Sequence, residues 1–230
     1  MSTTVAPAAP VLADLGPIAQ LRAGRLGRRL PQLVIGLWLY GVSLALMFRG
    51  DLGLAPWDVL HSGFIQHVPI TLGQAVVLMS FVVLLAWIPL REVPGVGTVG
   101  NAVLVGISVD VTLGMVGPVD GLVGRGLLMI AGVVLCALAT AVYIGAQLGR
   151  GPRDGLMTGL HRRTGLSIRL VRTALEVTVV VVGLVLGGAI GLGTVVFALA
   201  IGPLTQLMLP WFLVDLAAPV TPVDPEVSAP

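Results

Sequence analysis

Charged residues are scarce in this 230-residue chain, which has 13 arginines, no lysine and 11 acidic residues. Together they make up 10% of the chain, whereas a soluble domain has about 25%. Hydrophobic residues make up 56%. This composition excludes an ordinary soluble domain and indicates a protein whose main partner is a lipid bilayer.

The sequence also gives little support for disulfide bonds or metal sites. Cys136 is the only cysteine, so the chain can form neither an internal disulfide nor a thiolate cluster. His61, His67 and His161 lie between expected helices without metal-ligand spacing, and we interpret them as solvated histidines at the membrane interface. We therefore expect no metal, no cofactor, no nucleic-acid partner and no enzymatic activity.

Six apolar windows are each long enough to cross about 30 Å of hydrocarbon as a helix. They cover residues 31–48, 71–90, 98–117, 126–147, 169–190 and 194–214. The flanking segments, 1–30 and 215–230, are rich in proline or alanine, and we expect disordered tails there.

The arginines predict an orientation for these windows. Eleven of the 13 fall on one side of the membrane if every window crosses once, which leaves Arg49 and Arg125 on the other side. Cytoplasmic loops carry the excess of basic residues, so both termini are expected to be cytoplasmic.

The chain also repeats itself at an offset of 96 residues. Fourteen of the 59 pairs from residues 52–110 and 148–206 are identical, where roughly five would arise by chance. The predicted repeats, 31–120 and 121–214, each hold three windows, and an odd number makes the halves enter the membrane from opposite sides. We predict an all-α, polytopic membrane protein with six transmembrane helices in two inverted three-helix repeats.

One repeated motif is "LGLAPWDVLHSG" at 52–63 and "LGRGPRDGLMTG" at 148–159. Pro56 and Pro152 suit the first turn of a short helix, where Asp58 and Asp154 lie near its positive end. Such a helix either lies on the membrane surface or re-enters the membrane and meets its twin at a central site. In the second case Asp58 and Asp154 flank one pathway.

A second repeated motif is "GVGTV" at 95–99 and "GLGTV" at 191–195. It stands at the head of the third span of each half. Of the residues that recur in it, we assign a structural role to Gly97, Thr98, Gly193 and Thr194, as we do to Pro56 and Pro152 of the first motif.

Polar residues within the spans complete the candidate pathway. Asp110 and Glu176 are costly at this depth unless they are paired, protonated or hydrated. Asn101 shares a polar stripe with Asp110, and Gln206 is the repeat counterpart of Asp110. The alternatives are hydrogen bonding between helices for Asp110 and an ion pair with Arg172 for Glu176.

The two Pro-x-Asp segments and "GVGTVGNAVLVGISVDV" resemble the YczE/YyaS/YitT family of bacterial integral membrane proteins, nearest to the YczE type. The resemblance extends from about residue 30 to 214. It implies a multi-pass protein of the bacterial plasma membrane and assigns no catalytic or binding residue.

Two functions are open at this point. The first is a permease for an unidentified small solute, with proton coupling through a buried carboxylate. The alternative is a non-transporting scaffold or regulator of a partner export or biosynthetic system, which would use the arginine-rich segment 148–172 as its contact surface. Assembly of several copies is compatible with both.

Overall fold

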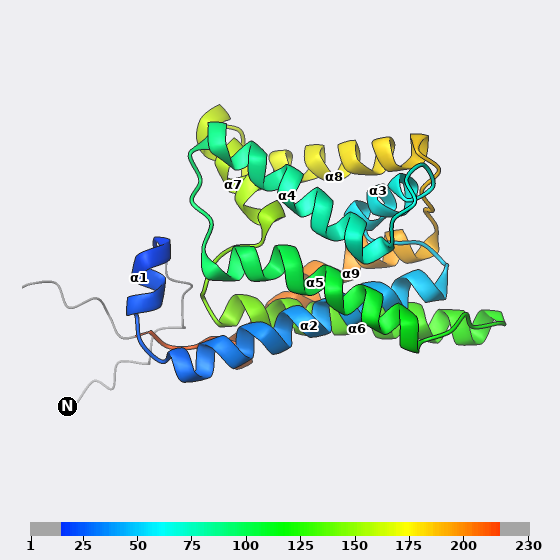
Figure 1. Cartoon of the computed structure of the whole chain (residues 1–230), viewed down its shortest axis with the longest axis horizontal. Coiled ribbons are helices and arrows are strands. Elements are labelled where there is room, and N and C mark those ends of the chain that lie inside the picture. Colours follow the sequence, from blue (N-terminus) through cyan, green and yellow to red (C-terminus); the bar gives the residue numbers. More distant parts are fainter. Residues whose placement is uncertain (1–14, 217–230) are drawn as a thin grey trace, which may run out of the picture.

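The computed structural model describes residues 15–216, which form helices and turns without any strand (Figure 1). The prediction of an all-α protein is thus confirmed for this range. The helices are α1 (Pro17–Arg22), α2 (Leu26–Gly50), α3 (Pro56–Phe64), α4 (Leu72–Leu90), α5 (Val96–Met115), α6 (Leu122–Gly145), α7 (Pro152–Thr164), α8 (Ile168–Val185) and α9 (Leu192–Phe212).

Five helices, α2, α4, α5, α6 and α9, are long and apolar enough to cross a membrane. The window expected at 169–190 corresponds to α8, which is not among them. Its 18 residues include Arg169, Arg172 and Glu176, and these three charges reduce its hydropathy. They follow the spacing of one helical face, so α8 is apolar on its other side.

The expected N-terminal tail is partly ordered, contrary to the prediction for residues 1–30. Helix α1 and the first turn of α2 lie in this stretch because Arg29 holds them against the end of α6. Arg29 is fully buried and donates hydrogen bonds to the carbonyl oxygens of Gln20 (2.6 Å), Ala146 (2.7 Å) and Gln147 (2.6 Å). The tails expected within 1–14 and 217–230 lie outside the described residues.

Replacing Arg29 with alanine is therefore expected to destabilise the fold by about 3–5 kcal/mol, because buried carbonyl groups lose their charged donor. The exposed neighbour Arg28 serves as a matched control, and Arg28→Ala should change the stability by less than about 0.5 kcal/mol. Chemical unfolding of both variants in the same detergent measures the difference. Equal stabilities would contradict the role given to Arg29.

The helix boundaries repeat at the same offset as the sequence. Four helices of the first half, α2 to α5, start 96 residues before α6 to α9. In Figure 1, α2, α5 and α6 run along one side of the molecule and α4 and α8 along the other. The short helices α3 and α7 lie toward opposite ends.

Helices α2 and α6 run antiparallel in close contact. A Cβ atom on Gly36 would lie 2.7 Å from the backbone nitrogen of Tyr143, and one on Gly132 would lie 2.6 Å from Cγ of Met47. These two contacts are equivalent, because Gly132 and Tyr143 are the repeat counterparts of Gly36 and Met47. Along this helix pair, the glycine of each half therefore packs against a larger residue of the other half.

Further packing contacts are exchanged between the halves, alongside those within each half such as α2 with α5 and α6 with α9. Helix α3 packs on α8 of the other half, as α7 packs on α4. The amide of Gly97 donates to the carbonyl of Leu148 (2.8 Å), and the amide of Gly193 donates to that of Leu52 (2.7 Å). Each half thus completes the packing of the other.

Candidate functional site

The starts of α3 and α7 are fixed by the repeated motifs. Pro56 and Pro152 occupy the first helical turn, as predicted, where a missing N–H costs nothing. Gly53 and Gly149, three residues before them, have φ angles of +120° and +130°, which favour glycine. The chain therefore turns sharply into each short helix.

Threonines of the "GxGTV" motifs hold these turns from the opposite half. The hydroxyl of Thr98 donates to the carbonyl of Arg150 (2.7 Å), and the hydroxyl of Thr194 accepts from the amide of Leu54 (3.1 Å). Together with the bonds from the Gly97 and Gly193 amides, they anchor the start of each short helix. The structural role assigned to these four residues is consistent with the contacts that they make.

The N-terminal ends of both short helices line one cavity of about 300 Å³. Repeat counterparts face it together, among them Trp57 with Arg153 and Tyr40 with Cys136. The cavity therefore lies where the two halves meet. Helices α5, α8 and α9 contribute further lining residues.

Four of the six predicted pathway residues line this cavity: Asn101, Asp154, Glu176 and Gln206. They come from α5, α7, α8 and α9 respectively, so residues distant in the sequence are brought to one place. The other two, Asp58 and Asp110, are placed differently.

Asp110, in α5, contacts the start of α4. Its carboxylate accepts hydrogen bonds from the hydroxyl of Thr71 (2.5 Å) and the amide of Gly73 (2.8 Å). Thr71 also forms a capping box with Gln74. Asp110 thus joins α5 to α4 by hydrogen bonding, as in the structural alternative, and it does not line the cavity.

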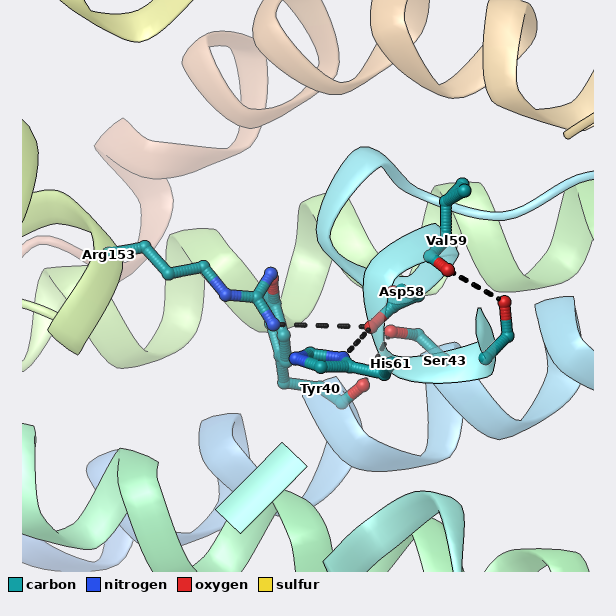
Figure 2. A network of polar contacts seen from close by, with 7 residues as sticks. Tyr40, Ser43, Asp58, Val59, His61 and Arg153 are labelled. Carbon is teal, nitrogen blue, oxygen red and sulfur yellow. Dashed lines mark hydrogen bonds and ion pairs between the residues drawn. The ribbon is translucent and has the colours of Figure 1, made fainter. Parts of the chain in front are cut away.

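Asp58 does not line the cavity and is 4% exposed; its contacts are drawn in Figure 2. One of its carboxylate oxygens is 3.0 Å from Nδ1 of His61 and 4.0 Å from a terminal nitrogen of Arg153. The interpretation of His61 as a solvated residue is wrong, because this side chain is 1% exposed. The two buried groups satisfy each other.

Helix α3 consequently turns its polar face inward. Asp58, His61 and Ser62 are buried, whereas Trp57 and Leu60 on the apolar face are only half-buried. A surface helix with Asp58 in water does not have this arrangement. Helix α3 belongs to the interior packing of the protein along that face.

Arg153 spans from α7 toward α3 (Figure 2). The central carbon of its guanidinium lies 5.1 Å from the centre of the Trp57 ring, within the range of a cation–π interaction. Its five N–H donors make no hydrogen bond to any residue in the described part of the chain, where the nearest carboxylate is that of Asp58 at 4.0 Å.

The other charged groups of the cavity are paired to different extents. Nε of Arg172 donates to Glu176 at 2.9 Å, which bears out the ion pair suggested for Glu176. Asp154 is half-buried and accepts a long hydrogen bond of 3.3 Å from the hydroxyl of Tyr143. Arg153 and Asp154 are therefore the least satisfied charges in the cavity.

All four charged residues that line the cavity belong to the second half. The first half places Trp57, Val76 and Ser80 at the positions of Arg153, Arg172 and Glu176. From the sequence, Arg153 and Arg172 entered the argument on membrane orientation, and Arg172 that on pairing with Glu176. Neither was predicted to line a cavity. The replacement of Trp57 by Arg153, between the Pro and the Asp that both copies keep, was the signal that could have identified Arg153.

Comparison with known proteins gives the family. Residues 27–210 match the model described as "Family of unknown function (DUF6198)". The chain belongs to this family. Among DUF6198 relatives, an "Uncharacterized protein" of Haemophilus influenzae is 37% identical over 177 residues, which are 77% of this chain and 81% of the relative.

Two relatives from Bacillus subtilis carry the names expected from the motifs. The "Uncharacterized membrane protein YczE" is 33% identical over 74% of this chain and 80% of its own length. The "Uncharacterized protein YyaS" is 26% identical over 76% and 90%, respectively. No solved structure gives a significant match. The resemblance to the YczE and YyaS proteins is confirmed, and with its apolar helices this DUF6198 member is a multi-pass integral membrane protein.

Proposed function

We propose that this protein is a permease of the bacterial plasma membrane that moves a small polar solute through the central cavity. The observation that carries the proposal is the position of the cavity. It lies between the N-terminal ends of α3 and α7, where the two halves meet, and it contains charges that are not fully paired. Inverted-repeat transporters place their substrate sites at such a meeting point.

The antiparallel pair α2 and α6 supports an inverted arrangement of the halves. In this proposal α8 is the sixth span: its 18 residues reach about 27 Å as a helix, and Arg172 and Glu176 face the cavity rather than lipid. Helices α3 and α7 are then re-entrant, entering from opposite sides with their first turns at the centre. The arginine distribution places both termini in the cytoplasm.

Transport by such a protein requires the cavity to open to each side in turn. The contact of Arg153 with Trp57 and its approach to Asp58 connect α7 to α3 across the cavity. We infer that this contact changes between the two conformations, because it joins the elements that enter from opposite sides. If solute movement is coupled to protons, Asp154 and Glu176 are the titratable carboxylates in the cavity lining.

The scaffold alternative has less support. Arg162 forms an ion pair with Glu92, and Arg163 donates to the carbonyl of Pro89, so two arginines of the segment 148–172 are engaged within the chain. These contacts reduce the surface available to a partner protein.

Uptake into proteoliposomes tests the permease proposal. Vesicles with and without the purified chain are incubated with a defined mixture of the twenty amino acids, acetate, succinate and putrescine, in the presence and absence of a pH gradient. Mass spectrometry of the lumen is expected to show at least tenfold accumulation of one component over empty vesicles. Equal contents in both sets of vesicles would overturn the proposal.

A further inference from the structure

We propose that the central cavity binds a small zwitterion of the amino-acid type, with its carboxylate on Arg153 and its ammonium group facing Asp154. This inference rests on the proposed function, because it assigns a substrate class to the same cavity. The argument starts from the charges that the protein itself leaves without a close partner.

Arg153 is the positively charged group of the site that is available to bind a negatively charged ligand group. Its side chain is three-quarters buried and lines the cavity, yet it makes no hydrogen bond to any residue within 15–216. Asp58, the nearest carboxylate, is 4.0 Å away and already in contact with His61. A guanidinium presents a planar fork of donors that matches a carboxylate, so a carboxylate ligand would satisfy it.

The positive charge offered to a ligand comes from Arg153 and not from the helix ends. The first turns of α3 and α7 both line the cavity, but they already contain Asp58 and Asp154, whose negative charges suit a helix N-terminus. The stacking of Arg153 on Trp57 fixes the guanidinium in the cavity lining.

Asp154 supplies the opposite pole. A carboxylate has about four lone-pair sites, and the long contact with the Tyr143 hydroxyl satisfies Asp154 only weakly. Tyr40 and Tyr143 also line the cavity, with their rings edge to face at 6.1 Å between centroids. Aromatic rings beside a carboxylate favour an ammonium group.

The overall charge balance decides between ligand classes. Arg172 and Glu176 neutralise each other at 2.9 Å, and Asp58, which is 4.0 Å from Arg153, does not line the cavity, so Arg153 and Asp154 are the remaining positive and negative groups of the lining. A simple anion would face the charge of Asp154, and a simple cation would face that of Arg153. Only a ligand that carries both charges satisfies both groups, and a volume of about 300 Å³ limits it to a small molecule.

Equilibrium binding to the full chain in lipid nanodiscs tests the substrate class. The probes are alanine, leucine and phenylalanine, each compared with the carboxylic acid that lacks its amino group and the amine that lacks its carboxylate. At least one amino acid is expected to raise the Tm in a saturable manner, with both of its analogues binding at least tenfold more weakly. Absence of binding by all three amino acids, or equal binding by either analogue, would overturn the inference.

Two variants test which residue binds the carboxylate of the ligand and which binds its ammonium group. Arg153→Gln should weaken binding of the amino acid at least tenfold without changing binding of the amine, and Asp154→Asn should do so without changing binding of the carboxylic acid. Arg163→Gln, on the exposed end of α7, is the matched control and should bind like the parent chain. If Arg153→Gln does not fold, Arg153→Lys takes its place and should weaken binding of the amino acid, because it keeps the charge and loses the planar fork. Unchanged binding in the folded Arg153 variant would overturn the assignment.

This experiment separates the substrate class from the proposed function. Binding in nanodiscs requires no movement across a membrane. Zwitterion binding without uptake would therefore count against the permease alone, and uptake of another solute class without zwitterion binding would count against this inference alone.

Discussion

Uptake by the Asp154→Asn variant is expected to fall at least tenfold relative to the parent chain. Asp154 lines the cavity and has no ion-pair partner within 4.0 Å among the described residues, so its carboxylate can face the solute although Tyr143 and the Gly151 backbone donate to it. The amide keeps the size of the side chain and removes the charge. Initial rates in proteoliposomes, normalised to the amount of folded protein, measure the effect.

Asp110→Asn is the matched control for this prediction. Asp110 lies outside the cavity lining and accepts bonds at the start of α4, so its replacement should cost about 1 kcal/mol of stability and leave the normalised rate unchanged. A large loss of uptake in Asp110→Asn, together with normal uptake in Asp154→Asn, would reverse the assignment of these two carboxylates.

Replacing Gly132 with leucine should prevent stable folding. A single Cβ at this position already lies 2.6 Å from Cγ of Met47 and 2.9 Å from the carbonyl oxygen of Ser43, so a larger side chain forces α2 and α6 apart. Overpacking of this kind costs about 1–3 kcal/mol or more. The yield of monodisperse protein after detergent extraction, and its Tm, should both fall sharply.

Gly126→Leu is the control on the same helix, because nothing in the described part of the chain lies within 4 Å of its Cβ position. That variant should express and melt like the parent chain. Since Gly36 is the repeat counterpart of Gly132, Gly36→Leu should reproduce the defect. Normal folding of both the Gly36 and Gly132 variants would show that the close approach of α2 and α6 is dispensable.

The repeated motifs predicted the elements around the site well. Local rules place Pro56 and Pro152 at helix starts, and an offset of 96 residues relates the helices of the two halves. Four cavity residues could also be anticipated, because polar side chains in apolar helices are costly and tend to lie in the interior. These predictions use information that is close in sequence or duplicated within it.

Other features depend on contacts between distant segments. Asp110 was expected in the pathway, but its acceptors are used by Thr71 and Gly73, and only the packing of α5 on α4 brings these groups together. His61 is buried in contact with Asp58, which its local sequence does not indicate. The order around Arg29 likewise depends on carbonyl groups more than 100 residues away.

The paired bonds from Gly97 to Leu148 and from Gly193 to Leu52 have a consequence for the origin of the chain. In each case the donor and the acceptor come from different halves, so one half alone would leave both groups without these partners. A precursor consisting of a single half would have needed a second molecule to supply these hydrogen-bond partners. Fusion of two such genes would then have converted an assembly of two identical chains into one polypeptide, whose second copy was free to acquire charges that the first copy lacks.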